Sequence, residues 1–204
     1  MTAVDDLRAA DPVLGALIDE LGPLDEEARR RGRPKDPYGA LLRAIVGQQL
    51  STKAARTIYE RMLALFDGRV PTPRELIDAN PDAIRAAGLS RPKIGYLRDL
   101  AERVEDGDLE LDRLAELPDD EVREQLTAVK GIGVWSADMF LIFDLGRPDV
   151  LAAGDLGIRR AAQQVYDLKE PPGETELTRI AEPWRPHRSL ACLYLWHSLD
   201  NEPA

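Results

Sequence analysis

The glycine-containing turn at residues 131–133 constrains the fold of this 204-residue chain more than any other feature. Leu117-Pro118-Asp119-Asp120 before it is typical of a helix start, because proline tolerates the first turn and acidic side chains favour the positive end of the helix dipole. Apolar residues follow at helical spacing until Gly131 and Gly133 interrupt the pattern. A second helix is expected over residues 134–145. The sequence therefore predicts two short helices joined by a tight hairpin.

Such a hairpin can bind an anion through its backbone. The first amides of a helix have no intrahelical acceptor, and the helix dipole favours negative charge there. We expect the N–H groups of Gly131, Gly133 and Val134 to face an anion such as a phosphate. The alternative is an ordinary helix end with no ligand, since glycine often ends helices.

Asp155 is the candidate catalytic residue, in the segment Ala-Ala-Gly-Asp-Leu-Gly-Ile-Arg-Arg. Aspartate is a favoured N-cap, so a capping role for the helix expected at 156–166 explains it as well. The two roles are compatible, because a carboxylate at a helix N-terminus stays ionised and can face developing positive charge.

Four motifs together carry a resemblance to a known family. They are the segment Asp-Pro-Tyr-Gly-Ala-Leu-Leu-Arg-Ala-Ile-Val-Gly-Gln-Gln-Leu-Ser at 36–51, the hairpin, Gly-Asp-Leu-Gly-Ile-Arg-Arg at 154–160, and Trp-Arg-Pro-His-Arg-Ser at 184–189. In this order they resemble the helix-hairpin-helix DNA glycosylases, and most closely the alkylation-repair branch of 3-methyladenine DNA glycosylase II. The resemblance runs from about Asp36 to Trp196.

The resemblance implies an all-α, two-lobed fold with the active-site cleft between the lobes and no extra β domain. One lobe is expected to comprise approximately residues 1–40 and 147–204, and the other, which contains the hairpin, residues 41–146. The periodicity agrees, because the only recurrent unit is a helix of roughly ten to fifteen residues.

The resemblance also assigns roles to residues at matching positions. Asp155 is the catalytic carboxylate, and the corner Gln48-Gln49-Leu50 carries the wedge that fills the space of the extruded nucleotide, with Gln49 as the first choice. We expect the base pocket to be formed by Trp135, Trp196, Tyr38 and Met139. Further phosphate contacts are expected from Arg91 and Lys93. Main-chain carbonyls of Thr127, Val129 and Ile132 match a Na⁺ or K⁺ site of the family.

The implied activity is hydrolysis of the N-glycosidic bond of alkylated purines, of the 3-methyladenine and 7-methylguanine type, in double-stranded DNA by base flipping. Bifunctional relatives have a lysine at the position of Trp135, and an indole cannot form a Schiff base, so a monofunctional enzyme without lyase activity is expected. Met139 departs from the family, whose alkylation-repair members often have an aromatic residue there.

Three other functions remain open at this stage. The same fold can act on uracil, hypoxanthine or an oxidised base. A non-catalytic helix-hairpin-helix DNA-binding protein needs the hairpin but not Asp155. A helical protein adaptor fits the acidic composition but leaves the hairpin, the Gln-Gln corner and Asp155 unexplained.

Charge and cysteine content limit the partners and cofactors. The net charge is −10, but residues 40–103 hold eleven Lys and Arg against seven Asp and Glu, whereas residues 104–125 hold two against ten. The acidic stretch is expected to be a solvated face. The single Cys192, expected in the core, excludes an iron–sulfur cluster, which needs four cysteines. No cofactor is expected to be required.

The chain is expected to act as a monomer in the bacterial-type cytoplasm, at the nucleoid when it acts, without membrane association. No apolar stretch approaches the roughly 20 residues of a membrane span, and the N-terminus is acidic without a signal-peptide core. The basic connector Arg29 to Lys35 is expected to be a solvated loop.

Overall fold

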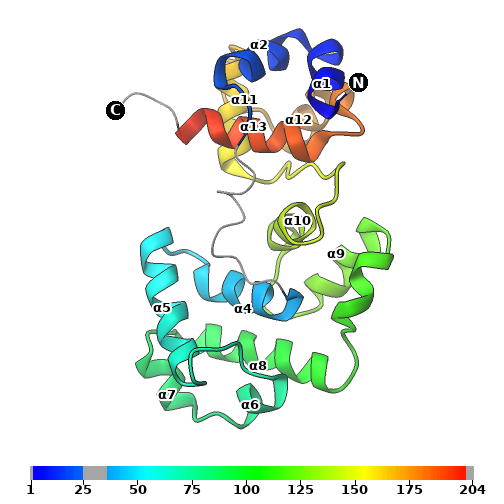
Figure 1. Ribbon diagram of the computed structural model, residues 1–204. Coiled ribbons are helices and arrows are strands. Elements are labelled where there is room, and N and C mark those ends of the chain that lie inside the picture. Colours follow the sequence, from blue (N-terminus) through cyan, green and yellow to red (C-terminus); the bar gives the residue numbers. More distant parts are fainter. Residues whose placement is uncertain (1, 25–35, 201–204) are drawn as a thin grey trace. The chain divides into compact units, whose positions relative to one another are not determined.

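The computed structural model describes residues 2–24 and 36–200, and every regular element in them is helical (Figure 1). The predicted connector over 29–35 lies outside the described residues. The elements are α1 (Ala3–Ala10), α2 (Pro12–Leu21), α4 (Pro37–Gly47), α5 (Thr52–Ala64), α6 (Pro73–Asp78), α7 (Pro81–Ala86), α8 (Arg91–Glu105), η1 (Leu111–Glu116), α9 (Asp119–Thr127), α10 (Val134–Phe143), α11 (Leu156–Val165), α12 (Glu174–Ile180), η2 (Glu182–Trp184) and α13 (Arg188–Asp200). The expected all-α fold is confirmed.

The chain divides into two compact units. Unit 1 comprises residues 1–31 and 141–204, and unit 2 comprises residues 32–140. The boundary between them falls inside α10, just after Phe140.

Unit 2 is built around α4 and α8, which pack against each other (Figure 1). The apolar stripe of α4, namely Leu41, Leu42, Ile45 and Val46, is at most 1% exposed. α5 covers one side of α4, while α6 and α7 pack on α8. This core holds both the wedge corner after α4 and the hairpin between α9 and α10.

Unit 1 is organised around α13, which packs on α1, α2 and α11. Asp11 joins three of its parts. It caps α2 through the N–H groups of Val13 and Leu14, and its second oxygen accepts from Tyr166 Oη at 2.6 Å and Trp184 Nε1 at 2.9 Å. A buried carboxylate with its hydrogen bonds satisfied in this way connects the start of α2 to Tyr166, at the end of α11, and to Trp184 in η2.

Side-chain caps begin several helices. Asp36, Ser51 and Asp155 each accept a backbone N–H of the helix that follows. α8 begins at Arg91, because Ser90 caps it and Pro92 is tolerated in its first turn. The acidic segment Leu111–Glu116 is a 3₁₀ helix.

Candidate active site

Asp155 is held in one orientation at the N-terminus of α11. Its Oδ1 accepts the backbone N–H of Ile158 at 2.8 Å and the indole N–H of Trp196 at 3.0 Å. Its side chain is half-buried, and its own N–H donates to the carbonyl of Ala152. The predicted cap is therefore confirmed, and the same carboxylate gains a second donor from α13. A carboxylate fixed by two N–H groups is suited to stabilising positive charge without reorganising.

Trp196 and Gly157 complete the surroundings of this carboxylate. The Trp196 ring stacks on Phe143 with a centroid distance of 5.6 Å and an interplanar angle of 24°. A Cβ at Gly157 would lie 3.0 Å from Asp155 Oδ1 and 3.5 Å from the Trp196 ring. The close approach explains a glycine two residues after the aspartate. Trp196, predicted as a pocket wall, thus also positions Asp155.

The hairpin exposes the backbone N–H groups that are expected to bind phosphate. Ile132 N–H donates to Val129 O at 3.1 Å and closes the turn. Among the residues that the structure describes, the N–H groups of Gly131, Gly133 and Val134 have no acceptor. All three residues are exposed, Val134 to 61%. Exposed amides at the start of α10 leave the hairpin open to an anion.

Two side chains of α8, Asp99 and Tyr96, hold the hairpin in place, and the sequence did not reveal them. Asp99 on α8 accepts the Lys130 N–H at 2.9 Å and pairs with the Lys130 and Arg103 side chains. Burial raises the pKa of Asp99, but the bonds from Lys130 and Arg103 outweigh it, so its pKa lies below the ordinary value. The Tyr96 ring lies where a side chain at Gly131 would be, with Cδ2 2.2 Å from the position of a Cβ.

The predicted wedge corner is a tight turn with a strained tip. The N–H of Leu50 donates to the carbonyl of Gly47 at 3.2 Å, and Gln48 has φ −51° and ψ 132°. Gln49 follows with φ 57°, a left-handed value that favours glycine in a type II turn. Gln49 is exposed and Leu50 is 38% exposed. A left-handed glutamine at an exposed tip is a feature that often marks a functional position.

Gln48 and Lys93 have intramolecular partners. The Gln48 Nε2 donates to the Gly131 carbonyl at 2.7 Å. The Lys93 ammonium donates to the carbonyls of Val46 at 2.7 Å and Gln48 at 2.6 Å. Two of the three N–H groups of Lys93 are thus committed inside the protein, which does not support its predicted contact with phosphate. Arg91 is exposed at the first position of α8, so its predicted contact stays a prediction.

Trp135 and Met139 occupy one face of α10. They are four residues apart, and the Trp135 side chain is 50% exposed whereas Met139 is half-buried. On another face, Asp138 pairs with Arg123 of α9 at 2.7 Å. Burial raises the pKa of Asp138, partly offset by Arg123. This ion pair joins the two helices of the hairpin.

Tyr38 lies in the interior of unit 2. It is 8% exposed and its hydroxyl has no hydrogen-bond partner in the described part of the chain. Burial raises the pKa of Tyr38 well above its ordinary value. A ring covered to this degree offers little face to an extruded base, so the structure does not support its predicted place in the base pocket.

The main-chain carbonyls predicted to hold a monovalent cation surround the hairpin turn. The Val129 carbonyl accepts the Ile132 N–H, and those of Thr127 and Ile132 accept no hydrogen bond from any described residue. Free carbonyl oxygens are suitable ligands for Na⁺ or K⁺, so these residues fit the group, and the site stays a prediction.

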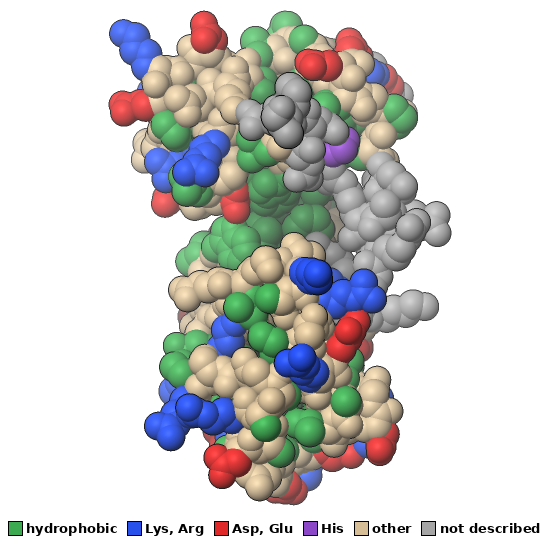
Figure 2. Space-filling model, turned by 90° about the vertical axis from the view of Figure 1, so that its left-hand side faces the viewer, with side chains coloured by type: hydrophobic (Ala, Val, Ile, Leu, Met, Phe, Trp, Pro, Cys, Tyr) green, Lys and Arg blue, Asp and Glu red, His purple; other side chains and the backbone are tan. Residues whose placement is uncertain are grey.

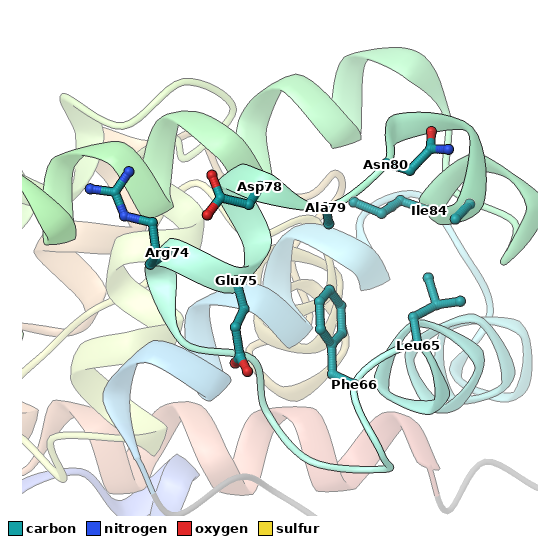
Figure 3. Close-up of a pocket in the computed structure, with 9 residues that line it drawn as sticks. Leu65, Phe66, Arg74, Glu75, Asp78, Ala79, Asn80 and Ile84 are labelled. Carbon is teal, nitrogen blue, oxygen red and sulfur yellow. The ribbon is translucent and has the colours of Figure 1, made fainter.

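A separate hollow of about 430 Å³ lies on unit 2 between α5, α6 and α7 (Figure 3). None of the predicted site residues lines it. Phe66, Leu65 and Ile84 form its apolar part, while Glu75 is bound to Arg69 and Asn80 caps α7. Glu75, Asn80 and Arg74, which pairs with Glu105, thus have partners within the fold, and we do not assign the reaction to this hollow.

The surface of unit 2 carries scattered positive charge. Figure 2 shows a face on which Lys and Arg side chains lie among hydrophobic and uncharged ones.

Cys192 is fully buried, as expected. Among the described residues, no helix combines the length and apolarity needed to cross a membrane.

Comparison with known proteins gives consistent results. Residues 42–186 match the family described as HhH-GPD superfamily base excision DNA repair protein. A DNA-3-methyladenine glycosylase of Schizosaccharomyces pombe is 39% identical over 164 residues, which cover 79% of this chain and 72% of the relative. Among solved structures, an S. pombe 3-methyladenine DNA glycosylase in complex with abasic DNA superposes with a TM-score of 0.87 at 33% identity, covering 99% and 98% of the two chains. A DNA-3-methyladenine glycosidase from Bacillus halodurans also gives 0.87, at 38% identity and 98% and 90% coverage.

Proposed function

Because the chain belongs to the HhH-GPD superfamily of base excision DNA repair proteins, we propose that it is a DNA glycosylase that removes alkylated purines from double-stranded DNA. The relatives named above are 3-methyladenine DNA glycosylases, which supports this class of lesion. The observation that carries the proposal is the carboxylate of Asp155, fixed by Ile158 and Trp196 in a half-buried position.

Asp155 acts at the sugar. As the bond between the sugar and the base breaks, the base leaves with the electron pair and the sugar carbon gains positive charge. The Asp155 carboxylate stabilises this charge and orients the water that adds to the sugar carbon. An alkylated purine is cationic before cleavage and leaves as a neutral molecule, so protonation by a general acid is not required.

Aromatic side chains account for recognition of a cationic base. Trp135 presents a half-exposed indole at the start of α10, and Trp196 lies directly beside Asp155. Stacking of a cation on an indole is worth about 0.5 to 2 kcal/mol, which separates cationic from neutral purines only moderately. We therefore expect a broad substrate range.

The hairpin and the Gln49 turn hold the DNA. Amides of Gly131, Gly133 and Val134 bind a phosphate, and Gln49 enters the base stack in place of the extruded nucleotide. A monovalent cation on the carbonyls of Thr127, Val129 and Ile132 would add positive charge near that phosphate. Binding through amides fits a chain whose net charge is −10.

Base release tests the proposal. Incubation with methylated duplex DNA should release 3-methyladenine and 7-methylguanine, and a duplex that contains uracil should release much less. Borohydride should trap no enzyme–DNA adduct, because Trp135 stands where a nucleophilic lysine would be needed. Preferential release of uracil would show that the enzyme acts on a different class of damaged base. If no base is released from any lesion, the protein is a non-catalytic DNA-binding protein instead.

A further inference from the structure

Gln48 connects the wedge turn to the hairpin. It occupies the second position of the turn Gly47–Leu50, directly before the strained Gln49. Its side-chain amide reaches Gly131, 83 residues further along the chain, and donates to that carbonyl at 2.7 Å. Gln48 thus joins the turn expected to enter the base stack to the hairpin expected to bind the DNA backbone.

Lys93 holds the other side of the same turn. The last carbonyls of a helix lack intrahelical donors, and α4 receives them from α8 instead. The Lys93 ammonium bonds Val46 O and Gln48 O, so it fixes the helix end and the backbone of Gln48 together. Burial lowers the pKa of Lys93, which agrees with an ammonium group that has left bulk water.

The hairpin end of this connection is itself rigid. The Tyr96 ring leaves room only for glycine at 131, and Asp99 holds the Lys130 N–H. Both supports come from α8, as does Lys93. The turn, the hairpin and α8 therefore form a closed set of contacts within unit 2.

We propose that Gln48 and Lys93 are positioning residues that keep the Gln49 turn in register with the phosphate-binding hairpin, so that backbone gripping and nucleotide extrusion occur as one step. The inference rests on the proposed glycosylase function. A left-handed residue persists only when its surroundings hold it, and these two side chains supply that restraint. Gln48 in this role is not part of the wedge, and Lys93 is not a phosphate contact.

The experiment compares Gln48→Met, Lys93→Met and the double variant with the wild type. Both substitutions keep an apolar stem and remove the donor. Lys53→Met is the charge-matched control, because Lys53 is exposed on α5 of the same unit. Three quantities are measured for the full chain: duplex affinity against salt concentration, fluorescence of 2-aminopurine placed beside an abasic-site analogue, and single-turnover release of 7-methylguanine.

Each single variant should lower the extrusion signal and the release rate by at least about 5-fold, because Gln48→Met removes one hydrogen bond and Lys93→Met removes two. The extrusion signal and release rate of the double variant should be no lower than those of the more impaired single variant, because both residues act through the same turn. The salt dependence of binding should match that of the wild type. Lys53→Met should leave extrusion and release unchanged.

Two results would overturn the inference. In one, both variants extrude the nucleotide as well as the wild type does. In the other, Lys93→Met lowers the slope of log affinity against log salt by about one, as removal of a phosphate contact does. If Lys93→Met does not fold, Gln48→Met decides alone, since Gln48 lies in a surface turn. A wild type that extrudes but releases no alkylated base would refute the proposed function, and the extrusion signal would still test the connection.

Discussion

Trp196 makes two contacts that one substitution can separate. Its ring stacks on Phe143, and its N–H donates to Asp155. In Trp196→Phe an aromatic ring remains but the donor is lost, so base release should fall about tenfold through a less restrained carboxylate. Single-turnover kinetics measure this effect. Phe143→Leu is the matched control, which weakens the stack but keeps the donor, and a larger loss there would contradict the positioning role of the N–H group.

Gln49 combines backbone strain with exposure, which predicts opposite effects on stability and activity. Gln49→Gly relieves the left-handed strain, so the free energy of unfolding should stay equal or rise by up to about 1 kcal/mol. Base release should fall because no side chain fills the stack. Urea unfolding and a base-release assay measure the two quantities. Activity that survives in the glycine variant would exclude Gln49 as the wedge.

Single residues were predictable where their role is local. Asp155 was identified as a cap because the helix it caps begins at the next residue. Asp99, Gln48 and Lys93 could not be assigned in this way, since their partners lie 31, 83 and 45 residues away in the chain. The burial of Tyr38 could not be predicted from its local sequence either, because it depends on elements that pack on α4 from elsewhere.

At the scale of elements, the two hairpin glycines have different requirements. Gly131 has φ 81° and faces Tyr96, whereas a Cβ at Gly133 would meet nothing within 4 Å. Gly131→Ala should lower the free energy of unfolding by about 2 kcal/mol or more, through strain and overpacking. Gly133→Ala should stay within about 1 kcal/mol of the wild type. Urea unfolding measures both, and equal losses would contradict the described turn.

The link between α8 and the hairpin predicts a pH-dependent stability. The pKa of Asp99 is lowered in the folded state, so its contribution is complete above its ordinary value of 3.8 and is lost as the pH falls through the folded value. Asp99→Asn should therefore be less stable than the wild type by about 1 to 2 kcal/mol near neutral pH. The difference should shrink below pH 3.8. A difference that is constant between neutral and acidic pH would contradict this.

Helix boundaries were predictable to within a few residues, because caps and prolines mark them in the sequence. The start of α8 is harder to locate in the sequence, because Pro92 is also typical of a turn and only the cap by Ser90 shows that it lies in the first turn of the helix. The acidic segment before α9 gave no signal that distinguishes a 3₁₀ helix from an α-helix.

At the scale of the whole molecule, the negative charge that would repel DNA is concentrated in one part of the chain. The net charge of −10 would oppose DNA binding, yet the segment 40–103 that builds most of unit 2 has a net charge of +4. The acidic residues concentrate in 104–125, which forms the end of α8, η1 and most of α9.

The order of motifs along the chain predicted the fold class, whereas the contacts that stabilise each unit came only from the structure.

The most direct test of the account is base release by Asp155→Asn. Asparagine keeps the cap of α11 and differs mainly in charge, so the variant should fold and bind duplex DNA like the wild type. Single-turnover release of 3-methyladenine and 7-methylguanine by this variant should fall at least about 100-fold, as when a preorganised electrostatic group is removed. Release at an undiminished rate in the variant would contradict the assignment of Asp155 as the catalytic carboxylate.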